Sequence, residues 1–140
     1  MNIYVVAVGS IKEKFFVDAI GEYKKRLSRY CKYEIIEVKD EKTPQNASNL
    51  EEEKIKEIEG ERILGKIKEK AYVIALAIEG GQISSEGLAK KMSELETRSR
   101  GNLYFVIGGS LGLSSKVLSR ADEKLSFSLM TFPHQLMRVI

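Results

Sequence analysis

Residues 102–113 read Asn-Leu-Tyr-Phe-Val-Ile-Gly-Gly-Ser-Leu-Gly-Leu, an apolar run that leads directly into a loop rich in glycine. A short apolar run bounded by glycines predicts a strand buried on both faces, as in parallel sheets covered by helices. Residues 3–8, 33–38 and 71–78 also indicate strands, and Leu125 and Phe127 alternate as a short fifth strand. This repetition makes a parallel sheet the centre of the predicted fold.

The segments between these runs have helical features. Ser48 and Glu51 have the spacing of a capping box that opens a charged helix, and further helices are predicted over residues 84–96, after Ser114 and from Pro133. The apolar positions expected to share one helical face are Phe16, Ile20, Tyr23 and Leu27 in the first helix, and Ile55, Ile58, Ile63 and Ile67 in the second. We therefore predict one α/β domain over residues 1–140, with a mostly parallel sheet and helices on both faces.

Composition excludes several classes of protein. The chain has 140 residues, of which 43% are hydrophobic and 31% charged, which is ordinary for a globular domain. No apolar run approaches the roughly 20 residues of a membrane span, and the N-terminus lacks the features of a secretory signal. The single cysteine, Cys31, excludes an internal disulfide and fits a reducing cytoplasm.

The net charge of +3 is too small to indicate a nucleic-acid-binding protein by itself. Its distribution is uneven, because the first helical region is basic and acids outnumber bases over residues 34–61. Two interpretations of the basic region remain: an ordinary solvated helix face, or a surface that binds the phosphates of a nucleic-acid backbone.

Ligands of parallel α/β sheets bind beyond the carboxyl ends of the strands, which directs attention to the loops at residues 79–81, 108–113 and 128–132. Gly108 and Gly109 fit either a tight turn or a close approach of a ligand to the backbone. Leu76 fits either the core or a ligand contact. Residues 126–134 mix apolar, thioether and hydroxyl groups, a composition that suits a mostly apolar pocket.

Several familiar sites are excluded by motif. The glycines at 108, 109 and 112 do not have the dinucleotide-binding spacing, and no glycine is followed by Lys-Ser or Lys-Thr as in a phosphate-binding loop. One histidine and one cysteine form no zinc or iron pattern, so we predict no metal, with a site made only of carboxylates left open.

Three segments of the sequence are distinctive: FVIGGSLGL at residues 105–113, ADEKLSF at 121–127 and MTFPHQLMR at 130–138. In these segments the chain resembles the bacterial large-subunit rRNA pseudouridine N3-methyltransferase family, the small single-domain branch of the SPOUT class. The resemblance also covers VAVG at 6–9, EYKKRL at 22–27, DEK at 40–42 and GERIL at 60–64, and so extends over nearly the whole sequence.

The resemblance implies a C-terminal trefoil knot, although threaded chains are very rare. It also implies that the three late loops bind S-adenosylmethionine and that the protein acts as a homodimer on ribosomal RNA, with no membrane and no DNA partner. The cofactor contacts carried over are Leu76, Gly108, Phe127, Ser128, Leu129, Met130, Thr131 and Phe132. Members of the family continue through a longer helix into a tail near Tyr-His, so the resemblance implies that these segments are missing after Ile140.

The implied reaction is methyl transfer to N3 of a pseudouridine in 23S rRNA of the assembled ribosome. N3 carries a proton that a base or a water has to remove. We name His134 and Arg138 as candidate catalytic residues: His134 could accept the proton or fix the start of the last helix, and Arg138 could hold a phosphate or a carbonyl oxygen of the base. The alternative is a non-catalytic RNA- or ribosome-binding module that kept the fold, which would not bind S-adenosylmethionine.

Overall fold

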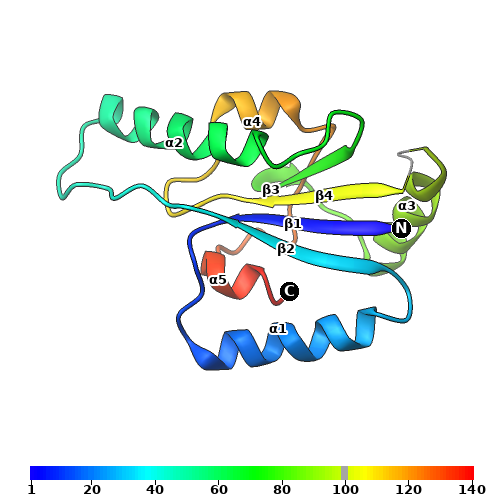
Figure 1. The fold of residues 1–140 in the computed structure, drawn as a ribbon. Coiled ribbons are helices and arrows are strands. Elements are labelled where there is room, and N and C mark those ends of the chain that lie inside the picture. The colour runs from blue at the N-terminus through cyan, green and yellow to red at the C-terminus, as the bar shows by residue number, and fades with distance from the viewer. Residues whose placement is uncertain (99–100) are drawn as a thin grey trace.

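The structure is a computed structural model in which residues 1–98 and 101–140 are described. Strands and helices alternate along the chain, as Figure 1 shows. The elements are β1 Asn2–Val8, α1 Lys14–Leu27, β2 Lys32–Val38, α2 Asn49–Leu64, β3 Tyr72–Gly81, α3 Ser85–Arg98, β4 Asn102–Ile107, α4 Ser115–Arg120, β5 Glu123–Leu125 and α5 His134–Met137.

The described strands form one five-stranded sheet in the order β2-β1-β4-β3-β5, and every pairing between them is parallel. The carboxyl ends of all strands therefore meet at one edge of the sheet. β4 has the bounds that its apolar run predicts, and it lies between β1 and β3 in the middle of the sheet. The predicted α/β class with a parallel sheet is confirmed.

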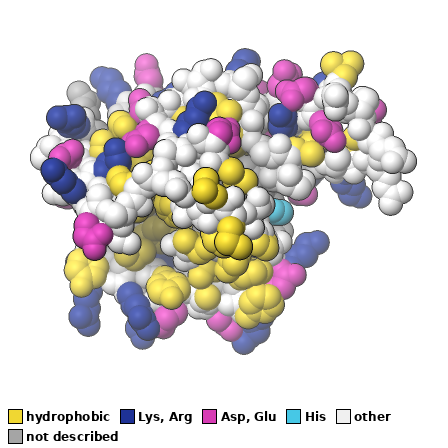
Figure 2. Space-filling model, turned by 180° about the vertical axis from the view of Figure 1, so that it is seen from behind, with side chains coloured by type: hydrophobic (Ala, Val, Ile, Leu, Met, Phe, Trp, Pro, Cys, Tyr) yellow, Lys and Arg dark blue, Asp and Glu magenta, His cyan; other side chains and the backbone are white. Residues whose placement is uncertain are grey.

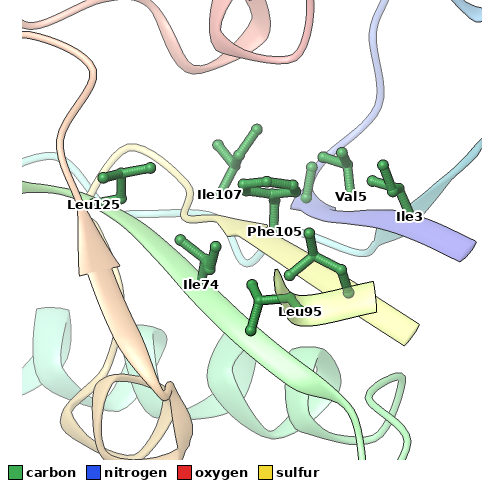
Figure 3. Packing of buried hydrophobic residues seen from close by; sticks show 9 residues of the cluster. Ile3, Val5, Ile74, Leu95, Phe105, Ile107 and Leu125 are labelled. Atoms are coloured by element: carbon green, nitrogen blue, oxygen red, sulfur yellow. The ribbon is translucent and has the colours of Figure 1, made fainter. Parts of the chain in front are cut away.

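Each face of the sheet has its own hydrophobic core. Ile74, Phe105 and Ile107 point to one face, where Leu95 of α3 joins them (Figure 3). Val6, Val73 and Val106 point to the other face and pack against Ile63 of α2 and Val117 of α4. In Figure 1, α2 and α4 cover one face, and α1 and α5 lie on the opposite side. The prediction of helices on both faces is confirmed.

The predicted start of α2 is confirmed in detail. The Glu51 N–H donates to Oγ of Ser48, and the Glu51 carboxylate accepts from the Ser48 N–H. Within α2, Ile55 and Ile63 are buried, whereas Ile58 is 43% exposed. The prediction for Ile58 is wrong because the inner face follows the spacing 55, 59, 63, and position 58 lies to one side of it.

Two further expectations differ from the structure. Residues 79–81, expected as a loop, extend β3, because Gly81 pairs with Leu125 of β5 beyond a bulge that follows Leu76. β5 ends at Leu125, so Phe127 lies outside the strand in which it was expected. The first difference brings an expected ligand loop into the sheet, and the second adds Phe127 to the segment that follows β5.

The predicted first helix is present as α1, but it contains no buried residue. Tyr23 is 51% exposed and Leu27 is 37% exposed, so the apolar face of α1 is largely open to solvent. No helix among the described residues is long and apolar enough to cross a membrane. The trefoil knot stays a prediction, because strand order alone does not establish threading.

Candidate functional site

A cavity of about 560 Å³ lies at the carboxyl edge of the sheet. Three separate parts of the chain line it: the end of β3 at residues 76–79, the loop after β4 at residues 107–113, and the segment after β5, which contributes residues 125–128 and 130–132. Lys56 and Leu118 add to its wall, and His134 and Met137 of α5 complete it. Its volume is in the range of small-molecule sites in proteins.

The structure brings together most of the residues that the sequence nominated as cofactor contacts. Those that line the cavity are Leu76, Gly108, Phe127, Ser128, Met130, Thr131 and Phe132. Leu129 does not line it, and it is 78% exposed. A role for these residues in cofactor binding stays a prediction, to which the shared cavity adds support.

The glycine loop after β4 closes tightly on itself. The N–H of Gly112 donates to the carbonyl of Gly109 at 3.1 Å, and Gly112 has φ +88°, a conformation that favours glycine. A Cβ added at Gly108 would lie 2.8 Å from the carbonyl carbon of Gly112. The tight turn is therefore present, and the loop lines the cavity, while the approach of a ligand to its backbone stays a prediction.

Glu59 of α2 lies against the outer side of this loop. Its side chain is buried, accepts a hydrogen bond from the Glu41 N–H at 3.0 Å, and would be 3.2 Å from a Cβ at Gly109. Burial raises the pKa of the Glu59 carboxyl, and the charge of Asp40 raises it further against the hydrogen bond from Glu41. Glu59 thus connects the β2–α2 loop to the glycine loop through one buried carboxyl group.

The segment after β5 is held by its own serines. Oγ of Ser126 donates to the Ser128 carbonyl at 2.7 Å, and Oγ of Ser128 accepts from the Met130 N–H at 2.9 Å. Among the described residues, the main-chain N–H groups of residues 127–129 and 131–132 make no hydrogen bond. An ordered loop with free main-chain donors beside an apolar cavity suits a heterocyclic ligand.

The two candidate catalytic residues lie in different surroundings. His134 begins α5 and lines the cavity. Arg138 points away from it: its guanidinium donates to the Val8 and Gly9 carbonyls at 2.9 and 2.8 Å and to the Glu37 carboxylate at 2.7 Å. Only 1% of the Arg138 side chain is exposed, and Nε is buried without a partner among the described residues. A catalytic role for either residue stays a prediction.

Two ionisable residues of the cavity were not predicted as site residues. Lys56 reaches it from α2, which no local sequence signal could indicate, because the contact depends on how α2 packs beside the glycine loop. Glu79 belonged to a segment that the sequence did nominate, immediately before Gly80. The described residues contain no group of three His, Cys, Asp or Glu side chains that could hold a metal ion.

Comparison with known proteins gives matches along the whole chain. The family described as "Predicted SPOUT methyltransferase" matches residues 1–140. The chain is 63% identical to ribosomal RNA large subunit methyltransferase H of Clostridioides difficile (strain 630), over all of this chain and 88% of that protein. It is 56% identical to the protein of the same name from Lactobacillus acidophilus, again over 100% of this chain and 88% of that protein.

Proposed function

Since the chain belongs to the SPOUT methyltransferase family, we propose that it transfers a methyl group from S-adenosylmethionine to N3 of a pseudouridine in large-subunit ribosomal RNA. The observation that carries this proposal is the cavity made by three late segments at the carboxyl edge of the sheet. The relatives named as ribosomal RNA large subunit methyltransferases support the substrate. We further propose that the enzyme acts on the assembled ribosome in the cytoplasm.

The residues of the cavity fit the proposed cofactor. Phe127 and Phe132 provide apolar surface for the adenine ring, and the free main-chain donors of the same segment would bind its nitrogen atoms. The absence of a Cβ at Gly108 lets the glycine loop close on the backbone of Gly112, and the space beside Gly112 is open within 4 Å of where its Cβ would lie. When bound, S-adenosylmethionine supplies an electrophilic methyl group. In this proposal the protein mainly aligns the nucleophile with that methyl group.

We assign different tasks to His134 and Arg138. His134 lines the cavity and can accept the N3 proton of the target base. Arg138 lies one turn further along and fixes this part of the chain to the end of β1 through the Val8 and Gly9 carbonyls. Arg138 is therefore a positioning residue, and its nearly complete burial leaves no surface for an RNA phosphate.

His134→Asn is expected to lower methyl transfer about a hundredfold or more, because loss of a general base typically costs that much. Binding of S-adenosylmethionine should change little, since His134 contributes one part of a large cavity wall. The assay supplies ribosomes and cofactor labelled in the methyl group, and calorimetry follows cofactor affinity separately.

Gln135→Ala is the matched control, because Gln135 follows His134 in α5 and does not line the cavity. Similar turnover by the His134 variant and the control would assign His134 to the start of the helix alone. No transfer by the unaltered protein would contradict the proposed function itself.

We also propose that the protein forms a homodimer with twofold symmetry. Apolar side chains gather on the face shown in Figure 2, and exposed apolar residues occur in α1, in the segment after β5 and after α5: Tyr23, Leu27, Leu129, Met130 and Ile140. Exposed apolar surface of this kind commonly marks an interface. A twofold interface uses the same surface of both copies, so one substitution changes it twice.

Ile140→Asp should therefore weaken self-association at least about tenfold, because each copy places a charge in place of a buried apolar side chain. Sedimentation velocity at micromolar concentrations measures the effect. Leu50→Asp is the control, since Leu50 is 68% exposed on α2, which covers the side of the sheet opposite to α1 and α5 (Figure 1). A monomeric unaltered protein, or equal effects of the two substitutions, would contradict the proposed dimer.

A further inference from the structure

The excess positive charge of the chain is concentrated in one region. Residues 12–32 contain seven bases and three acids, a net charge of +4, whereas the whole chain carries +3. The remaining residues together are therefore slightly acidic. Because α1 contains no buried residue, this charge lies on the surface of the molecule.

Most bases of residues 12–32 without an ion-pair partner lie at or just after the end of α1, and only Lys12 precedes the helix. Lys14 pairs with Asp18 at the start of α1, and Arg26 pairs with Glu22 in its second half. Within the part of the chain that the structure describes, none of the following exposed bases forms an ion pair: Lys24, Lys25, Arg29 and Lys32. They form, with Tyr30, the surface that we call the α1-end patch.

Tyr30 is the second feature of the patch. Its side chain is 81% exposed, the largest exposed fraction among the exposed large apolar and aromatic residues of the described structure. It lies in the turn between α1 and β2, directly after Arg29. Packing does not account for an aromatic ring with so little contact. A ring of this kind, surrounded by cations, has the composition of surfaces that stack nucleic-acid bases.

The favourable effect of cations at a helix C-terminus accounts for part of the patch. Lys24 and Lys25 lie in the last turn of α1, where a positive charge interacts with the helix dipole. This effect fades beyond the last turn, however, and Arg29 and Lys32 follow the helix. It also gives no reason for the exposure of Tyr30. A second copy of the chain is a poor partner for this surface, since it would bring the same positive charges to a twofold contact.

We propose that the α1-end patch binds ribosomal RNA at a place separate from the methylated nucleotide, with phosphates on its four bases and an unpaired nucleobase stacked on Tyr30. This inference rests on the proposed function. α1 returns from the carboxyl end of β1 to the amino end of β2, a length of about 21 Å for its 14 residues. The patch therefore lies at the edge of the sheet opposite to the cavity. In this proposal the patch increases the affinity for ribosomal RNA and makes no contact with the cofactor or the methylated base.

The test combines Lys24→Gln, Lys25→Gln and Arg29→Gln in one variant. The matched control combines Lys54→Gln, Lys66→Gln and Lys90→Gln, which remove the same charge from exposed positions elsewhere on the molecule. Binding to ribosomes and to isolated large-subunit rRNA is measured between about 50 and 200 mM salt. The patch variant should bind at least about tenfold more weakly, and the slope of log affinity against log salt should be smaller by about two to three, because three phosphate contacts are lost.

Measurements of methyl transfer distinguish a loss of RNA binding at the patch from a general structural defect. The patch variant should raise KM for ribosomes and keep kcat and the affinity for S-adenosylmethionine, as should Tyr30→Ala. Tyr30→Phe should restore binding, because it keeps the ring that stacks. Equal losses by the patch variant and the control, or a change in self-association by the patch variant alone, would overturn the assignment. No binding or methylation of rRNA by the unaltered protein would overturn the proposed function, and the patch with it.

Discussion

Gly108→Val is expected to weaken binding of S-adenosylmethionine about ten- to a hundredfold, as measured by calorimetry. A Cβ at this position would lie 2.8 Å from the carbonyl carbon of Gly112, so the glycine loop has to open. Forcing extra atoms into a packed site typically costs about 1–3 kcal/mol, and each 1.4 kcal/mol corresponds to about a tenfold change in affinity. Gly108 itself lines the cavity, so the two methyl groups of the valine side chain would also change the cavity wall.

Gly21→Val provides the matched control, because a Cβ at Gly21 meets no atom within 4 Å. Circular dichroism and thermal unfolding distinguish local opening of the loop from loss of the fold. Unchanged cofactor affinity in a folded Gly108 variant would remove the glycine loop from the proposed binding site.

Arg138→Met is expected to lower the free energy of unfolding by about 2–4 kcal/mol, measured by urea denaturation. The substitution keeps the apolar part of the side chain but removes the donors to two carbonyls at the end of β1 and the ion pair with Glu37. Leaving a buried acceptor without a partner costs about 1–3 kcal/mol. Loss of the ion pair adds less than at a fully buried site, because the Glu37 side chain is 46% exposed.

Arg26→Met is the corresponding control for a surface arginine. Arg26 pairs with Glu22, but its side chain is 70% exposed, so its removal should cost less than about 1 kcal/mol. Similar stabilities of the two variants would show that the hydrogen bonds of Arg138 contribute little. A stable Arg138 variant with reduced methyl transfer would indicate that its main effect is on the position of His134.

Local patterns were sufficient for the elements of this fold. The apolar run of β4 and the Ser48–Glu51 capping box both depend on neighbours in sequence, and both occur as predicted. The error at Ile58 arose because the buried face of α2 includes Glu59 and Gly60, so the positions of the isoleucines alone do not identify it. Residues 79–81 were misjudged for a similar reason, because glycines form a strand there only through pairing with β5.

The site could be predicted as a set of segments more readily than as a set of contacts. The rule that ligands bind at the carboxyl ends of parallel strands, with the family resemblance, nominated seven residues that line one cavity. It could not show that Leu129 is absent from the cavity wall or that Lys56 of α2 contributes to it. Nor could it show the direction of Arg138, whose partners Val8 and Gly9 lie about as far away in sequence as the chain allows.

The pairing of β1 with β4 also has a consequence for how the chain folds. Asn2 pairs with Asn102, so the two central strands of the sheet meet only after a loop of about a hundred residues has closed. The entropy of that closure has to be overcome before the contacts between the strands contribute any stability, and folding rates fall as such distant contacts dominate a topology. During synthesis β1 emerges first and stays without its inner neighbour until β4 has been made. Its apolar residues Val5 and Val6 are exposed to aggregation throughout that interval.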